Sequence, residues 1–187
     1  DLKAPVRRVQ CFQAMMGATS GGSLQTSLAP LTHAIKLSNG VNLEDPFLIG
    51  GVTENGVRDE DEFQTTCAFN SMLGAWTAPF MMEKINARTT RRSSALIGYG
   101  PNFNYQETII VPSEKIAKKM VQQRVNPIHP NNLKKLIDAG RLPKAGEGPS
   151  PKVRATSKFV GIFVAEADDE AHTTSITAVS GGEAGYE

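Results

Sequence analysis

Three arginines that follow one another closely carry the most distinctive chemistry in this sequence. Arg88, Arg91 and Arg92 lie between Asn86 and Ser93. On a helix, Arg88 shares a side with the residues three and four positions later. Guanidinium groups bind planar oxyanions through paired hydrogen bonds, so the segment predicts a site for a substrate carboxylate or phosphate. The alternative is that these arginines pair with acidic residues on the surface or across a subunit interface.

Two tyrosines follow this segment. Tyr99 lies beside glycines in a predicted turn, and Tyr105 lies in a predicted strand. A phenol can donate a proton to a reducible carbon or carbonyl, but tyrosines in such positions are more often packing residues. We therefore include Tyr99 among the candidate substrate-binding residues and assign no catalytic residue.

A glycine-rich turn at residues 17–22 lies between a predicted strand and a predicted helix, which is the setting of a dinucleotide-binding turn. Its glycines, at positions 17, 21 and 22, match neither GxGxxG nor GxxGxxG. No acidic residue ends a second strand about 20 residues later, as a ribose contact requires. We therefore interpret the segment as a tight turn into a helix capped by Ser23. Gly21, Gly22 and Ser23 could still offer backbone amides to an anionic group held by a neighbouring domain.

Histidine and cysteine give no sign of a metal site. His33, His129 and His172 have no ligand spacing to one another. Cys11 and Cys67 are too few for a disulfide framework or a zinc site. We predict no metal, and two reduced cysteines favour an intracellular compartment.

The composition and charge of the chain argue against nucleic-acid binding and against a membrane span. The chain has 187 residues, of which 40% are hydrophobic and 21% charged, and this suits one domain. Its 20 basic and 19 acidic residues give a formal net charge of +1, so nucleic acid is not an expected partner. No run approaches the roughly 18 apolar residues of a membrane span.

The elements that must position these residues follow from apolar spacing and capping residues. Long loops are expected at 41–63 and 144–151. The order of elements predicts an α+β fold, with a mostly antiparallel or mixed sheet and helices packed on one face. The predicted strands are 6–16, 105–111, 152–167 and 172–180, and the predicted helices are 23–37, 79–87 extending toward 96, 114–125 and 131–139.

The segment from 75 to 107 resembles a region of the saccharopine dehydrogenase-like oxidoreductases. Its successive motifs are Pro-Phe-Met-Met, Ile-Asn, Arg-Arg-Ser, Tyr-Gly and Phe-Asn-Tyr-Gln-Glu. Further segments agree with the family in order, although Ser23 and Ala184 stand where the family has threonine and proline. These segments are Gly21-Gly22-Ser23, Asp45-Pro46-Phe47-Leu48, Gly146 to Ser150 with Arg154 and Phe159, and Ser180 to Tyr186.

The resemblance implies a nicotinamide-dependent oxidoreductase, in a family that includes saccharopine reductases and trans-acting enoyl reductases. It implies that residues 1–187 are the substrate-side and dimerisation domain, and that NAD or NADP is bound mainly by a Rossmann domain absent from this chain. The implied partners are that domain, a second copy of the protein, and a small-molecule or lipid-like substrate. We expect the chain alone to be inactive.

Two other interpretations stay open. The chain starts at Asp1 rather than Met and stops in a loop-like segment, so we expect an internal fragment. One alternative is a non-catalytic interaction or scaffold protein that retains this domain without a nucleotide site. Another is a free-standing dehydrogenase that uses residues 17–22, which the glycine spacing disfavours. The location is either the cytoplasm or a mitochondrial or lipid surface.

Overall fold

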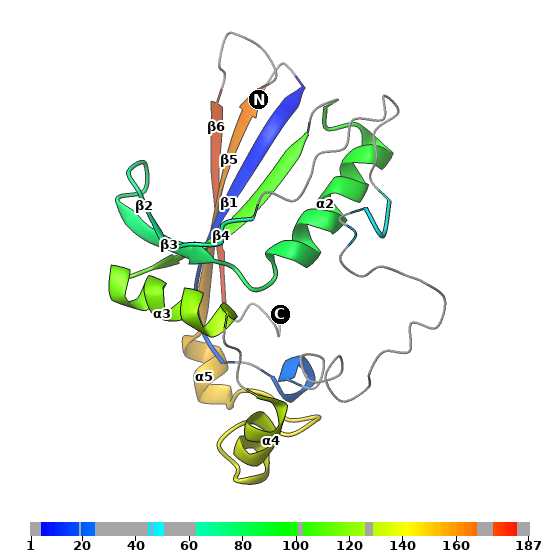
Figure 1. Ribbon diagram of the computed structural model, residues 1–187. Coiled ribbons are helices and arrows are strands. Elements are labelled where there is room, and N and C mark those ends of the chain that lie inside the picture. Colours follow the sequence, from blue (N-terminus) through cyan, green and yellow to red (C-terminus); the bar gives the residue numbers. More distant parts are fainter. Residues whose placement is uncertain are drawn as a thin grey trace. The chain divides into compact units, whose positions relative to one another are not determined.

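The computed structural model describes residues 5–18, 20–24, 45, 47–50, 63–100, 103–125, 129–167 and 174–182. They form an α+β fold around a six-stranded mixed sheet in the order β2-β3-β4-β1-β5-β6, which confirms the predicted fold class (Figure 1). The chain divides into two compact units, described separately below. The first is Asp1–Ala14, Asn42–Gln122 and Gly161–Val179, and the second is Met15–Val41, Gln123–Val160 and Ser180–Glu187.

The strands are β1 (Val6–Met16), β2 (Ala68–Asn70), β3 (Ala75–Pro79), β4 (Asn104–Val111), β5 (Lys158–Ala167) and β6 (Thr174–Gly181). The helices are α2 (Glu83–Ile97), α3 (Glu114–Val125), α4 (Pro130–Asp138) and α5 (Pro151–Thr156), and residues 21–24 are also helical. Among the described residues, no helix combines the length and the hydrophobicity that a bilayer span requires.

The register of β4 with its two neighbours defines the faces of the sheet. β1 runs parallel to β4, with Cys11 opposite Glu107, whereas β3 runs antiparallel to β4. Successive side chains of a strand point to opposite faces. One face, called the helix face, carries Cys11, Gln13, Tyr105, Glu107, Ile109 and Val111. The other, called the reverse face, carries Arg8, Gln10, Phe12, Asn104, Gln106 and Thr108.

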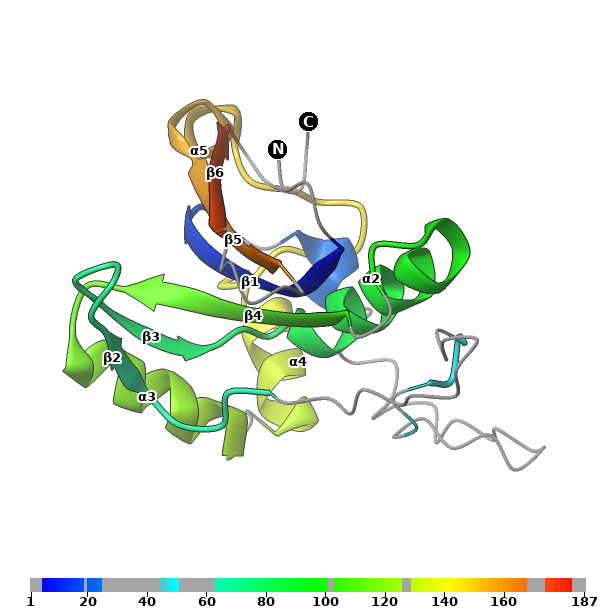
Figure 2. The same ribbon diagram turned by 90° about the horizontal axis from the view of Figure 1, so that it is seen from above.

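The two helices described in the first unit, α2 and α3, lie on the helix face. Asn86 of α2 donates a hydrogen bond to Glu107 of β4. Ala117 of α3 is fully buried in a cluster with Ala78 and Val111, and α3 lies along β2, β3 and β4 (Figure 2). The expectation that helices pack on one face of the sheet therefore holds in this unit.

The start of α2 differs from the prediction. Pro79 was expected in the first helical turn, but it is the last residue of β3 and pairs with Thr108. The helix begins at Glu83 and ends before Gly98, whose left-handed backbone (φ 72°) suits a glycine and whose N–H donates to Ser94 O. The expected helix therefore starts four residues late, because the unpredicted β2–β3 hairpin uses Pro79.

The remaining described elements divide into confirmed and corrected predictions. β1, β4, α3 and α4 lie close to their predicted bounds, and Ser113 Oγ accepts from Ile116 N at the start of α3, as expected (3.4 Å). The strand predicted from residue 152 instead begins at Lys158. Ser150 caps α5 through Val153 N (3.3 Å), and Pro151 occupies its first turn. The predicted 168–170 turn lies outside the described residues.

The helix that follows the glycine-rich turn is capped by Ser20 rather than by Ser23. Ser20 Oγ accepts from Ser23 N at 3.1 Å, so the helix begins at Gly21. A Cβ at Gly21 would lie 1.7 Å from the carbonyl oxygen of Lys144, so this position requires glycine. Residues 25–37 of the predicted helix lie outside the described residues, as does most of the expected 41–63 loop.

Candidate functional site

A buried carboxylate on the helix face joins β1, β4 and α2. Glu107 is only 1% exposed. Its Oε2 accepts from Asn86 Nδ2 at 2.7 Å and its Oε1 accepts from Gln13 Nε2 at 2.9 Å. Both carboxylate oxygens therefore have a side-chain donor, as a buried ionisable group requires. Asn86, one of the predicted site residues, holds α2 on the sheet through this contact.

A second buried carboxylate completes the edge of β4. Glu83 is fully buried, and its Oε1 accepts from the backbone N–H of Glu107 at 3.3 Å. The pairing of β3 with β4 ends at Pro79 and Thr108. Beyond this pair, the Glu83 carboxylate rather than β3 accepts the hydrogen bond from the β4 backbone. Among the described residues, no three His, Cys, Asp or Glu side chains gather as a metal site would require.

Burial keeps two other ionisable groups of this cluster protonated. Burial, followed by the nearby Glu107 carboxylate, raises the pKa of the Cys11 thiol to about 12. Burial also raises the pKa of the Tyr105 phenol, with further contributions from Cys11 and Glu107. At neutral pH the thiol is therefore a poor nucleophile and the phenol a poor proton donor. The hydrogen bonds of the cluster fix α2, β1 and β4 relative to one another.

The predicted arginines lie along α2. Arg88 and Arg91 are buried, at 9% and 6% exposed, whereas Arg92 is exposed. The Arg91 guanidinium lies 4.9 Å from the centre of the Phe47 ring, a cation–π contact. Arg92 Nη1 donates to Ile49 O at 2.7 Å. Two of the three arginines thus hold the 47–50 turn against the helix.

That turn belongs to the Asp-Pro-Phe-Leu motif of the sequence. Phe47 N donates to Asp45 Oδ1 at 2.9 Å, and Gly50 N donates to Phe47 O at 2.8 Å. Phe47 is 8% exposed. The described part of the motif is therefore a tight turn whose aromatic ring is buried against Arg91.

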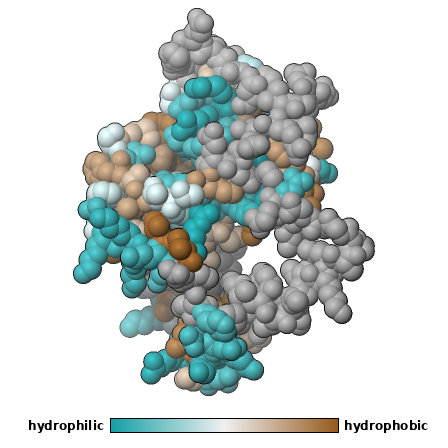
Figure 3. All heavy atoms as spheres, in the orientation of Figure 1, coloured by the Kyte–Doolittle hydropathy of each residue, from teal (hydrophilic) through white to brown (hydrophobic). Residues whose placement is uncertain are grey.

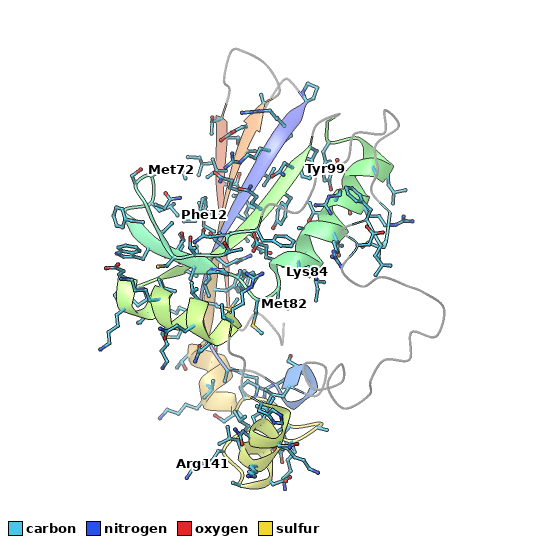
Figure 4. All side chains as sticks on the ribbon, in the orientation of Figure 1. Phe12, Met72, Met82, Lys84, Tyr99 and Arg141 are labelled. Atoms are coloured by element: carbon cyan, nitrogen blue, oxygen red, sulfur yellow. The ribbon has the colours of Figure 1, made fainter. Side chains whose placement is uncertain are left out.

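The other predicted residues of this group lie toward the end of α2. Ser93 Oγ donates to Thr89 O within the helix at 3.1 Å. Tyr99 is exposed, and its ring meets the ring of Phe103 edge-on at 5.2 Å. In Figure 4, Tyr99 lies beyond the far end of α2, whereas Met82 and Lys84 mark its start. The structure thus spreads Asn86, Arg88, Arg91, Arg92, Ser93 and Tyr99 along one helix and the turn after it.

The predicted glycine site belongs to the second unit. Gly21 N donates to Glu147 O at 2.9 Å, and Ser23 N donates to Ser20 Oγ. Gly22 lies exposed between them. Since two of the three amides are already used within the chain, this turn does not fit a dinucleotide pyrophosphate.

Sequence reasoning missed the carboxylate cluster itself. Gln13, Glu83 and Glu107 received no role in the sequence analysis. A glutamate among the β-branched residues of a strand, as at Glu107, is the signal that could have identified it, because a buried charge needs partners.

The apolar residues just before and at the start of α2 differ in their burial. Phe80 is 7% exposed and Trp76 packs against the Ala78–Val111–Ala117 core. Met81 and Ile85 are 79% and 58% exposed. Hydrophobic surface accordingly lies beside the hydrophilic surface of the first unit (Figure 3).

Comparison with known proteins gives two relatives. They come from two strains of Mycobacterium tuberculosis, and each is named "Putative trans-acting enoyl reductase". Each is 29% identical to this chain over an aligned length of 163, and the match covers 76% of this chain and 38% of the relative. The chain therefore spans well under half the length of these curated relatives. No protein-family profile and no solved structure matches it. The chain is a distant relative of proteins that are named as reductases.

Proposed function

We propose that this chain is the substrate-side domain of an NAD(P)-dependent oxidoreductase of the saccharopine dehydrogenase-like family. The names of the two mycobacterial relatives support a reductase. The motifs that carry the family resemblance support the finer assignment. The intact protein would reduce an enoyl substrate, as the name of the relatives indicates, and the substrate would be a small or lipid-like molecule.

The observation that carries the proposal is that these motifs contact one another. The Asp-Pro-Phe-Leu turn packs on Arg91 and Arg92 of α2. The Phe-x-Tyr-x-Glu motif ends at Glu107 of β4, which accepts from Asn86 of the same helix. Motifs that are distant in sequence thus meet on α2, which is expected when a family preserves one arrangement around a site.

Within this proposal, α2 is the element that holds the substrate. Asn86 and Glu107 fix the helix on the sheet, and Arg88, Arg91 and Arg92 provide positive charge for an anionic part of the substrate. Tyr99 is an exposed hydroxyl at the end of the helix. Tyr105 is not assigned as the proton donor, because burial raises its pKa.

The cofactor would be bound outside this chain. The turn at residues 17–22 does not fit a dinucleotide, because its amides are used by Glu147 and Ser20. We propose a Rossmann domain in the same protein for NAD or NADP, and a homo-oligomer in which this domain contributes to the subunit interface.

The test uses the full-length protein. Its intact mass should lie well above the 20.1 kDa of this chain. It should oxidise NADH or NADPH only when an enoyl thioester is added, and mass spectrometry should detect the saturated product. Arg92→Met should slow this reaction, whereas Arg141→Met, an exposed arginine after α4 (labelled in Figure 4), should not. An intact mass near 20.1 kDa without nucleotide binding would contradict the proposal.

A further inference from the structure

Side chains of the reverse face line most of a pocket that the proposed function does not use, and Cys11 and Glu83 also contribute to its lining. Its volume is about 390 Å³, within the range of small-molecule sites. All of its lining residues belong to the first unit. The lining includes Gln10 and Phe12 of β1, Gln106 and Thr108 of β4, Thr77 of β3, and Gln64.

Side-chain amides and hydroxyls dominate the polar lining. Gln10 Nε2 donates to Gln106 Oε1 across the parallel strand pair at 3.3 Å. Gln64 Nε2 lies 3.3 Å from Thr77 Oγ1 on the neighbouring strand. A carboxamide carries two N–H donors and a carbonyl acceptor, and a hydroxyl both donates and accepts. The wall is thus suited to a ligand that also donates and accepts.

Two threonines of this pocket are buried but differ in their hydrogen bonds. Thr77 is 2% exposed, and its Oγ1 bonds to Gln64 and to Ala68 O. Thr108 is 8% exposed, and its buried Oγ1 has no hydrogen-bond partner among the described residues. Proteins pair nearly all buried polar groups, so such a hydroxyl at a pocket wall indicates a missing partner.

Two more polar residues of β1 and β4 on the same face have a buried polar atom. Arg8 and Asn104, which are opposite each other in the register, each have a buried polar atom without a partner in the described part of the chain. These atoms are Arg8 Nε and Asn104 Oδ1. Arg8 and Asn104 precede Phe12 and Thr108 by four residues on their strands, so they lie on the same face of the sheet.

The charges of the pocket select against an anion. The twelve lining residues include no lysine, arginine or histidine. The one carboxylate, Glu83, is fully buried and accepts from the backbone N–H of Glu107. Phe12, 4% exposed, adds an apolar wall. An uncharged ligand with an apolar part matches this lining.

We propose that this pocket binds a small uncharged molecule that carries a carboxamide. The amide hydrogen-bonds with Thr108 Oγ1 and the glutamine pair, and the apolar part packs against Phe12. The proposal concerns binding alone, so it stands or falls independently of the oxidoreductase function.

The test compares three molecules of nearly the same shape and different charge. Benzamide is neutral, benzoate is an anion and benzamidine is a cation. Each is titrated into the full-length protein and followed by saturation-transfer NMR. Benzamide should bind with a Kd on the order of 1 mM, and the two charged probes should bind at least about 10-fold more weakly. Equal or tighter binding of benzoate, which would point to Arg8, or of benzamidine, which would point to Glu83, would overturn the proposal, as would no binding of benzamide.

A variant separates binding from stability. Thr108→Val removes the hydroxyl and keeps the shape, so benzamide affinity should fall about 10-fold while the melting temperature does not fall. Thr177→Val, at an exposed position of β6, is the matched control and should change neither. Unchanged affinity in Thr108→Val overturns the proposal. Gln10→Met is a second binding variant in case Thr108→Val folds poorly, and unchanged benzamide affinity in it also overturns the proposal.

Discussion

Adjacent residues of β4 occupy opposite sides of one sheet and differ in how their polar groups are satisfied. On the helix face, Glu107 accepts from Asn86 and from Gln13. On the reverse face, the Thr108 hydroxyl has no partner among the described residues and lines a pocket. At this pair of residues, the helix face uses its polar group for internal cohesion, whereas the reverse face has a hydroxyl that we propose to bind a ligand.

The largest effect should come from removing the centre of the helix face. Glu107→Ala leaves the amides of Asn86 and Gln13 without their acceptor and opens a cavity, so we expect a loss of about 3–5 kcal/mol in the free energy of unfolding. Urea unfolding measures this loss. A loss below about 1 kcal/mol would show that the cluster does not hold α2 on the sheet.

The second-largest effect is expected at alkaline pH, which should lower the free energy of unfolding through Cys11 on the helix face. The pKa of Cys11 is raised from 9.0 to about 12 in the folded protein, so between these values the unfolded thiol loses its proton while the folded thiol keeps it. Stability from this group is therefore intact below about pH 9 and is lost as the pH rises toward 12, by up to about 1.4 kcal/mol per pH unit. Tyr105 shifts in the same direction.

The measurement is the urea midpoint from about pH 8 to about pH 11, in the wild type and in Cys11→Ala. The variant should lose stability less steeply with pH, because it lacks the thiol. Parallel slopes in the two proteins would show that Cys11 titrates normally and is not held protonated by its surroundings.

The smallest effect on stability is expected when the two threonines of the pocket are replaced by valine. Thr77→Val removes a hydroxyl that bonds to Gln64 and Ala68, so we expect a loss of about 1 kcal/mol in the free energy of unfolding. Thr108→Val should cost nothing or should stabilise the protein, because no described partner is lost. Equal losses in the two variants would show that Thr108 has a structural partner and would remove the contrast between the faces.

Local signals made several elements predictable. Ser113 caps α3 and Gly140 follows α4, and both lie where capping rules place them. The hairpin β2–β3 was missed because its strands, Ala68–Asn70 and Ala75–Pro79, are short and contain alanine, which favours strands weakly. The Ser-Pro start of α5 was assigned to a connection, although it carries a cap and a first-turn proline.

The candidate site was harder to predict, because its contacts join distant parts of the chain. Gln13 and Glu107 are 94 residues apart, and Asn86 and Glu107 are 21 apart. The arginines were found from their spacing, but spacing did not reveal that Arg91 packs on Phe47. The pocket hydroxyl of Thr108 could not be distinguished from that of Thr77 without the fold.

The parallel pairing of β1 with β4 also affects how the protein folds. Gln10 and Gln106 are 96 residues apart in sequence, whereas β3 and β4 are near neighbours in sequence. Closing so long a loop carries an entropic penalty before any contact compensates for it, and contacts between distant residues slow folding. We therefore expect the β3–β4–α2 segment to form first and β1 to join it late, an order that pulsed amide exchange during refolding can test. The two faces of the sheet would thus acquire their chemistry in the same final step, when the first strand arrives.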